Sequence, residues 1–198
     1  MLWTMPRPKT VGDGAVLDAA HRVVDRAGPG GLTLAAVARE VGLAPATLIQ
    51  RFGSKRGLLL AIARRAADDG GAPLREAARR HRRPLRALVA GLVEIGSAVS
   101  SPESLANQLA FLQIDLSDPE FHVLALAHAQ ALRREIAALL ESAVSAGELR
   151  AQDTARLAQT VQTTYNGALI TWGIYRRGTL ASWMRRELES VLAPHRTD

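Results

Sequence analysis

The sequence of 198 residues contains no cysteine, and only eight of its residues are aromatic. Without cysteine, disulfide bonds, thiolate metal sites and cysteine nucleophiles are excluded. No window approaches the roughly 18–20 consecutive apolar residues that a membrane span requires. The N-terminal ten residues contain prolines and basic residues but no apolar run follows them, so no signal peptide is predicted. We therefore expect a soluble, cytoplasmic protein with no membrane partner.

Helix-forming residues dominate the composition. Alanine alone occupies 35 positions, apolar residues make up 47% of the chain, and 23 of its 25 basic residues are arginine. Ala, Leu and Arg all favour helices, and β-branched residues do not gather in the alternating runs typical of strands. The sequence therefore predicts an all-α protein of about nine or ten helices. The arginine and alanine bias is also typical of a GC-rich bacterial genome.

The whole net positive charge of the chain comes from its first third. Residues 1–67 contain ten basic and four acidic residues, whereas residues 68–198 contain fifteen of each. This asymmetry indicates that the first third contacts a polyanion and that the remainder does something else. Arg7 and Lys9 form a basic N-terminal arm that can reach a DNA minor groove, or stay unused in solvent.

Helix signals divide the chain into short and long segments. Apolar spacing predicts a helix over 16–27 that stops at the glycines and proline of 28–31. Helices then follow from Thr33, as a cap, to Gly42, from Ala44-Pro45 to Phe52, and from Ser54, again a cap, to about residue 66. The segment 68–73 is the clearest linker. Beyond it we expect a short basic helix to about residue 82 and helices over about 84–100, 101–116, 117–147, 153–177 and 180–193. The predicted domains are 1–67 and 68–198.

Two short helices joined by a glycine turn form a helix-turn-helix unit. The unit needs a small residue in its first helix, a glycine at the turn where positive φ is often required, and an apolar residue that holds the second helix down. Ala38, Gly42 and Leu48 supply these three. The triplet alone is a weak signal in an alanine-rich chain, but a supporting helix precedes it and the basic excess surrounds it.

The stretch from Thr33 to Leu60, TLAAVAREVGLAPATLIQRFGSKRGLLL, resembles the TetR family of bacterial transcriptional regulators. The resemblance covers about residues 11–65, and the Phe-x-Ser-Lys-x-x-Leu tail after the second helix makes it specific. Two positions depart from the family pattern: Ala44 replaces a serine that often caps the recognition helix, and Ile49 replaces a tyrosine that commonly contacts a phosphate. The resemblance implies an N-terminal three-helix DNA-binding domain and a helical C-terminal domain for ligand binding and dimerisation.

On this interpretation the helix from Pro45 to Phe52 enters the major groove of double-stranded operator DNA. Gln50 is the candidate to read adenine, and Arg51 either reads guanine or binds a phosphate. Pro45 and Ala46 can touch thymine methyl groups, while Leu48 and Phe52 pack inward. Thr33, Thr47, Ser54 and Lys55 are the candidates for phosphate contacts. The predicted DNA-binding residues are Thr33, Pro45, Ala46, Thr47, Gln50, Arg51, Ser54 and Lys55.

Family members usually pair through their last two helices and hold a small-molecule pocket in the second domain. Apolar stripes on those helices predict a homodimer through a four-helix bundle, or else they close the monomer's own core. The predicted interface residues are Leu157, Val161, Leu169, Met184, Leu188, Val191 and Leu192. The candidate contacts for a moderately hydrophobic effector are Asn107, Gln108, Phe111, Asp115, His128, Gln162, Tyr165, Asn166 and Trp172.

The sequence thus predicts a homodimeric repressor that binds palindromic operator DNA and is released by a small effector. One alternative is a dimeric DNA-binding regulator without an effector. A remote alternative is a helical enzyme, but the five histidines are scattered and no phosphate loop or nucleophile elbow is present. No catalytic residue, cofactor or metal ion is expected.

Overall fold

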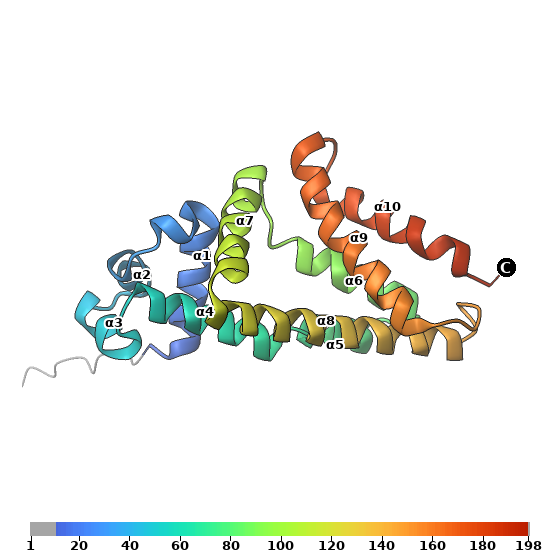
Figure 1. Ribbon diagram of the computed structural model, residues 1–198, viewed down its shortest axis with the longest axis horizontal. Helices are drawn as coiled ribbons and strands as arrows, with labels where there is room; N and C mark the ends of the chain where they lie inside the picture. The colour runs from blue at the N-terminus through green and yellow to red at the C-terminus, as the bar shows by residue number, and fades with distance from the viewer. Residues whose placement is uncertain (1–10, 198) are drawn as a thin grey trace, which may run out of the picture.

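The computed structural model describes residues 11–197, and over this range it consists of ten α-helices and one short 3-10 helix (Figure 1). The all-α fold predicted from composition is confirmed. Arg7 and Lys9 lie outside the described residues. The helices are α1 (Asp13–Gly31), α2 (Leu34–Val41), α3 (Pro45–Phe52), α4 (Lys55–Asp69), α5 (Ala72–Arg80), α6 (Pro84–Gly96), α7 (Pro102–Ser117), α8 (Pro119–Ser145), α9 (Thr154–Tyr175), α10 (Leu180–Leu192) and η1 (Ala193–His195).

Short polar side chains fix where most helices begin. The Thr33 side chain accepts a hydrogen bond from the Ala36 amide at 3.0 Å, and the Ser54 side chain accepts one from the Gly57 amide at 3.1 Å. Such caps satisfy amides that have no partner within the first turn. Equivalent side-chain caps start the later helices at Ser101, Asp118, Asp153 and Thr179. The stop predicted after residue 27 corresponds to Gly28, whose φ of 68° interrupts α1 before its last turn.

The segment 68–73 is not an extended linker, which corrects the sequence prediction. Helix α4 continues to Asp69 and α5 begins at Ala72, so only two glycines separate them. Helix α8 crosses this turn closely: a Cβ on Gly70 would lie 2.9 Å from Nδ1 of His128. The glycines are therefore required by close packing between helices and not by a need for flexibility.

The molecule is elongated, with α1–α4 at one end and α9 and α10 at the other (Figure 1). Helix α7 stands against α1, and α4 and α5 lie along the long helix α8. At the far end α6 packs against α5, α8 and α10, and α9 packs against α8 and α10. Because α4 packs along α8, and α1 against α7, the first four helices pack directly against the rest of the chain.

Buried apolar side chains form two clusters. The first contains side chains of α1–α4 together with Phe121, which is only 1% exposed. The second contains side chains of α5–α10. Phe121 belongs to α8, and Phe111 of α7 also packs against the first cluster. The core around the helix-turn-helix unit therefore includes residues from beyond position 67.

The predicted dimer-interface residues are mostly part of the monomer's own core. Leu157, Val161, Met184, Leu188 and Leu192 are buried within the single chain, while Leu169 and Val191 are partly buried and pack against the same cluster. For the five buried residues the interface prediction is wrong. Their apolar stripes face α6 and α8 of the same subunit, so a second subunit has no access to them.

None of the helices between residues 11 and 197 combines the length and apolar character needed to span a bilayer.

Candidate nucleic-acid interface and ligand pocket

The helix-turn-helix geometry follows the predicted triplet. Ala38 and Leu48 are fully buried between α1, α2 and α3. Gly42 ends α2 in the left-handed conformation, with a φ of 69°, and its amide donates to the carbonyl oxygens of Ala38 and Arg39. A left-handed residue at this point turns the chain sharply, so α3 starts at once and crosses over Ala38.

One face of α3 is exposed among the described residues. Pro45, Ala46 and Gln50 are exposed on it as predicted, and Thr47 is half-buried. Leu48 is buried and Phe52 half-buried, as predicted for the inward face. Ile49 is also 52% exposed, a large apolar side chain beside Gln50 that the sequence interpretation did not include among the contact residues. The sequence did contain a signal for this exposure: in a helix, the residue that follows the inward-facing Leu48 points about 100° away from it.

Arg51 has a structural role that the sequence did not reveal. Its Nε donates to a carboxylate oxygen of Asp13 at 2.8 Å, and its Nη1 donates to the Val11 carbonyl oxygen at 2.8 Å. Nη2 also pairs with Asp13. The guanidinium therefore ties the C-terminal end of α3 to the start of α1. Arg51 must therefore leave Asp13 before it can contact a base or a phosphate.

The start of α4 lies beside α3 and presents the other predicted polar residues. Ser54 is exposed and caps α4, and Lys55 donates from Nζ to the Gly30 carbonyl oxygen at 2.6 Å. An ammonium has three donors, so Lys55 keeps donors for a further acceptor. Thr33 is exposed at the start of α2. Thr33, Ser54 and Lys55 thus lie at the same end of the molecule as α3 (Figure 1).

Most arginines of the first third form ion pairs with partly or fully exposed acids. Arg22 and Arg26 pair with Glu40, and Arg65 pairs with Asp18 at 2.7 Å. Two more reach acids outside the first third: Arg56 contacts Asp118 at 2.7 Å, and both Arg56 and Arg64 contact Glu120, at 3.1 and 3.0 Å. Exposed pairs of this kind contribute little to stability, about 0–1 kcal/mol each, so they can exchange for phosphate contacts.

A cavity of about 370 Å³ lies between α1, α4, α7, α8 and α9. Seven of the nine predicted effector contacts line it: Gln108, Phe111, Asp115, His128, Gln162, Tyr165 and Asn166. Apolar side chains such as Val24, Ile62 and Leu132 complete most of its wall. A largely apolar cavity with a few polar groups is typical of sites for small ligands.

Two predicted contacts, Asn107 and Trp172, do not line this cavity. Asn107 donates its amide to the Asp25 carbonyl oxygen at 2.7 Å, which holds α7 against α1. Trp172 is buried in the second core cluster, and its Nε1 donates to the Gly178 carbonyl oxygen at 3.2 Å. Both side chains are polar groups satisfied by the fold, which corrects the prediction that they contact an effector.

Acidic groups dominate the charge of the cavity. Asp25 and Asp115 both line it, with Nε2 of His21 3.7 Å from a carboxylate oxygen of Asp25, and no lysine or arginine does so among the described residues. Burial raises the pKa of Asp115 from 3.8 to about 6, and the charges of His128 and His122 act in the opposite direction. A half-buried carboxylate without a firm cationic partner favours a ligand that carries positive charge.

Histidine and amide side chains in the cavity are oriented by backbone carbonyls. Nδ1 of His128 lies 2.7 Å from the Ala66 carbonyl oxygen, and Gln162 donates its Nε2 to the Ala129 carbonyl oxygen at 2.9 Å. A carbonyl only accepts, so Nδ1 of His128 carries the hydrogen and Nε2 remains for other contacts. Burial raises the pKa of Tyr165, so its hydroxyl stays protonated and can donate.

The sequence interpretation missed the part of the cavity that comes from the first third of the chain. His21, Val24 and Asp25 of α1 and Ile62, Ala63 and Ala66 of α4 all line it. No local signal identifies these residues, because their proximity to α7 and α8 depends on contacts between segments far apart in sequence. Among residues 11–197, no group of three or more His, Asp or Glu side chains is arranged to hold a metal ion.

Comparison with known proteins agrees with this geometry. Residues 16–62 match the family described as bacterial regulatory proteins, tetR family. The HTH-type transcriptional regulator BetI of Rhizobium meliloti (strain 1021) is 29% identical over 174 residues, which are 85% of this chain and 78% of BetI.

Solved structures share the fold across almost the whole chain. A putative transcriptional regulator from Saccharomonospora viridis in complex with choline superposes with a TM-score of 0.72 and 22% identity, over 91% of this chain and 94% of the other. SmeT, the repressor of the Stenotrophomonas maltophilia multidrug efflux pump SmeDEF, gives a TM-score of 0.68 and 21% identity, over 96% of this chain and 92% of SmeT. Residues 16–62 therefore carry the helix-turn-helix unit of the tetR family of bacterial regulatory proteins, and the chain as a whole is similar to BetI and to solved structures of transcriptional regulators.

Proposed function

We propose that this protein is a ligand-responsive repressor of the TetR type, which binds palindromic operator DNA as a homodimer and is released by a small effector. The observation that carries the proposal is the path of α4. Its first turn, with Ser54 and Lys55, lies beside α3, and its later residues Ile62, Ala63 and Ala66 line the cavity. A ligand that moves α4 therefore also moves the start of the DNA-binding surface.

Residues of α3 and of the two caps supply the proposed DNA contacts. Gln50 reads a base, and Pro45, Ala46 and the newly identified Ile49 contact thymine methyl groups in the major groove. Thr33, Thr47, Ser54 and Lys55 bind phosphates, assisted by the free amides of the first helical turns. Arg51 positions α3 through Asp13, and it can exchange this exposed pair for a phosphate contact when DNA binds.

We further propose that residues 1–67 form the DNA-binding domain and that residues 68–198 form the dimerisation domain and most of the effector pocket. Residues of α1 and α4 complete that pocket. The shared core at Phe121 and the ion pairs of Arg56 with Asp118 connect the two domains. The second domain therefore supports the first domain's fold as well as its regulation.

The proposed homodimer uses the outer face of α9. With the inner stripe buried, the free face carries Thr163, Gly167, Ile170 and Ile174, which share one side of the helix. Ile170 and Ile174 are large exposed apolar side chains, and a Cβ on Gly167 would meet nothing within 4 Å. A second copy of α9 can therefore approach this face closely, and two-fold pairing would place the two α3 helices on successive half-sites.

The proposed effector is small, partly apolar and positively charged. The cavity's apolar wall, the carboxylates of Asp25 and Asp115 and the aromatic ring of Phe111 together suit an alkylammonium group. Choline, which is bound in the similar regulator from Saccharomonospora viridis, is therefore the first probe to use. The alternative of a regulator without an effector predicts no saturable binding in this cavity.

Selection of genomic DNA fragments by the purified protein at about physiological salt tests the function. The expected result is one palindromic motif with half-sites roughly 34–36 Å apart. Gln50→Ala should relax the preference at one position of each half-site by about 1–3 kcal/mol, while binding to the other positions is retained. Failure to enrich any palindrome, or a Gln50→Ala motif identical to that of the wild type, would contradict the proposed reading helix.

Asp115→Asn tests the effector pocket through its pH dependence. Cation binding needs the ionised carboxylate, and a pKa of about 6 means that the ionised fraction rises about tenfold between pH 5 and pH 7. Choline affinity of the wild type, measured by calorimetry, should rise by about that factor over this range. The variant should bind weakly at both pH values, and the exposed Asp69→Asn should behave as wild type.

Asp115→Asn should also change how the free energy of unfolding depends on pH, in a direction that the pKa of Asp115 predicts. The pKa of Asp115 is raised in the folded state, so the folded protein holds this proton more tightly than the unfolded chain does. The contribution of Asp115 to the free energy of unfolding therefore falls as the pH rises from about 4 through 6. The free energy of unfolding of Asp115→Asn, taken relative to that of the wild type, should therefore be greater at pH 7 than at pH 4. Equal differences at the two pH values would contradict the assignment.

Coupling between the two sites distinguishes an effector that releases the repressor from DNA from a ligand that binds without any effect on DNA affinity. If the effector favours a conformation that fits the operator poorly, operator DNA must weaken choline binding by the same factor, typically about 5–150-fold. Titration of the free protein and of the operator complex measures both affinities. Equal affinities would leave a DNA-binding regulator whose ligand has no part in release.

A further inference from the structure

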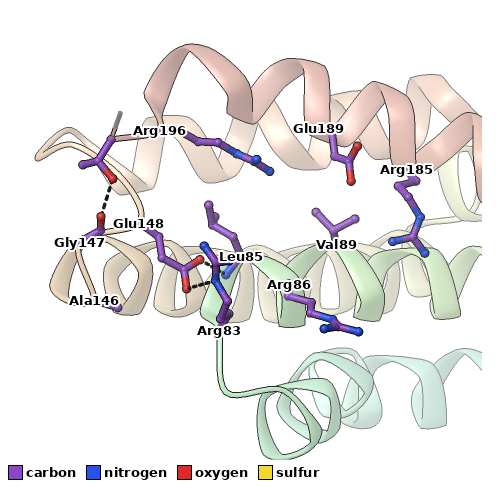
Figure 2. Close-up of a pocket in the computed structure, with 11 residues that line it drawn as sticks. Arg83, Leu85, Arg86, Val89, Ala146, Gly147, Glu148, Arg185, Glu189 and Arg196 are labelled. Carbon is purple, nitrogen blue, oxygen red and sulfur yellow. Dashed lines mark hydrogen bonds and ion pairs between the residues drawn. The ribbon is translucent and has the colours of Figure 1, made fainter.

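A second cavity, of about 810 Å³, lies between α6 and α10 (Figure 2), at the end of the molecule away from α3 (Figure 1). Its wall comes from the first turns of α6, the loop that follows α8, one side of α10 and the C-terminal segment. It shares no lining residue with the cavity beside α4. Any ligand bound here would therefore be distinct from the proposed effector.

Arginines outnumber acids on this wall. Arg83, Arg86, Arg185 and Arg196 line the cavity together with only two acids, Glu148 and Glu189. One of those acids is already used by the fold: Glu148, whose side chain is 10% exposed, pairs with Arg83 at 3.3 Å and accepts the Leu85 amide at 3.3 Å. That pair caps the start of α6 and is electrically neutral.

Three arginines are left facing a single carboxylate. None of Arg86, Arg185 and Arg196 belongs to an ion pair formed within residues 11–197. Figure 2 shows Arg185, Glu189 and Arg196 following one another along the α10 side, with Arg86 on the α6 side. Positive charges on opposite walls of one cavity repel, and an anion placed between them removes that repulsion.

The backbone that carries Arg196 is fixed by the loop after α8. The Arg150 amide donates to the His195 carbonyl oxygen at 2.9 Å, and Nε of Arg150 donates to the Arg196 carbonyl oxygen at 3.1 Å. The Thr197 amide donates to the Glu148 carbonyl oxygen at 3.3 Å, and Leu149 and Arg196 form an antiparallel bridge. The C-terminal segment is thereby held at the cavity, which reduces the entropy lost when Arg196 binds a ligand.

We propose that this cavity binds a small organic polyanion, with Arg86, Arg185 and Arg196 as its cationic contacts. Guanidinium groups bind phosphate and carboxylate oxygens in pairs of hydrogen bonds. The volume is far larger than one inorganic phosphate needs, and the three arginines stand on both walls, so the ligand carries two or more charged groups on a compact frame. Phosphate esters and polycarboxylates share this chemistry. The site is independent of the proposed DNA contacts and of the cation pocket.

Calorimetric titration of the full chain tests the proposal with inorganic pyrophosphate and citrate as separate probes, at constant ionic strength. At least one probe should bind saturably, once per subunit. The double variant Arg86→Ala/Arg185→Ala should weaken that binding by about tenfold or more for each charge-assisted contact removed. Binding of pyrophosphate alone assigns the site to phosphate groups, and binding of citrate alone assigns it to carboxylates.

Arg133→Ala/Arg134→Ala is the matched control, since it removes two exposed arginines of α8 that form no ion pair within residues 11–197. It should bind the probe as the wild type does. Glu189→Gln keeps all the arginines and removes the opposing carboxylate, so it should bind several-fold more tightly. This second variant also tests the site if the arginine double variant fails to fold by circular dichroism.

Three results would overturn the proposal. The first is that neither probe binds at millimolar concentration. The second is that the control double variant loses as much affinity as the cavity double variant, which would show an effect of net charge alone. The third is that Glu189→Gln leaves the affinity unchanged or lowers it. Competition by double-stranded DNA of any sequence, with loss of that DNA affinity in the cavity double variant, would instead make this surface a nucleic-acid contact and would also contradict the proposal.

Discussion

Gly57→Ala is expected to abolish specific DNA binding and to destabilise the first four helices. A Cβ on Gly57 would overlap the Phe52 carbonyl oxygen and lie 3.2 Å from the carbonyl carbon. The same oxygen accepts the Ser54 amide at 2.8 Å, so the turn between α3 and α4 has no room to open. A clash with backbone cannot be relieved by rotation of a side chain. We expect a loss of roughly 3 kcal/mol in the free energy of unfolding, at the upper end for overpacking.

Gly14→Ala is the matched control, because it makes the same chemical change in a helix of the same domain. A Cβ on Gly14 would meet nothing within 4 Å. Alanine there should stabilise α1 by up to about 1 kcal/mol through helix propensity. Denaturant unfolding of both variants, with operator binding measured on the folded protein, checks the prediction. Equal stabilities for the two variants would contradict the tight α3–α4 turn.

Phe121→Ala should destabilise the DNA-binding helices although it lies far outside them in sequence. The Phe121 ring is buried in the first core cluster, meets Phe111 edge to face with ring centroids 6.1 Å apart, and has the Arg56 guanidinium 5.3 Å from its centroid. Removal of a buried phenylalanine side chain typically costs about 3–5 kcal/mol. Hydrogen exchange should show the lost protection in α1 and α4 as well as in α8.

Val123→Ala provides the comparison, since Val123 lies two residues further along α8 and is 65% exposed. Its substitution should change the free energy of unfolding by less than about 0.5 kcal/mol. If Phe121→Ala left protection in α1 and α4 unchanged, the first four helices would be stable without α8. The shared core would then have no energetic consequence.

Phe121 also provides a physical route between the two proposed sites. Phe111 lines the effector cavity and contacts Phe121, which in turn packs under Arg56 in the first turn of α4. Arg56 is further held by Asp118 and Glu120 at the start of α8. A ligand that displaces Phe111 therefore acts on the same turn that presents Lys55. This contact chain is the element through which binding at one site can bias the other.

The local elements of this protein are determined by its sequence. Side-chain caps at Thr33 and Ser54 start α2 and α4, Gly28 interrupts α1, and Gly42 in the left-handed conformation sets the turn before α3. Each of these depends on hydrogen bonds or steric limits within a few residues. The helix-turn-helix unit and the family resemblance could therefore be identified without a structure, because all their parts lie within a short stretch of chain.

Tertiary structure decided which side chains are available to a partner. Arg51 looks like a base reader in the sequence, yet Asp13, 38 residues earlier, holds its guanidinium. Likewise the apolar stripe with Val161 and Met184 reads equally well as a dimer interface or as a core, and it is core because α6 and α8 cover it. Helical periodicity shows which face of a helix is apolar, but it contains no information about what covers that face.

The two cavities show the same limit. Sequence reasoning identified pocket residues on α7, α8 and α9, whose polar groups stand out on apolar helices, but not those on α1 and α4. The arginines of the second cavity are separated by about a hundred residues and are ordinary in an arginine-rich chain until α6 and α10 bring them together. Local sequence fixed the helices and their ends, because capping and helix propensity act within one or two turns. Long-range packing alone brought these side chains together, because burial and charge are shared between segments distant in sequence.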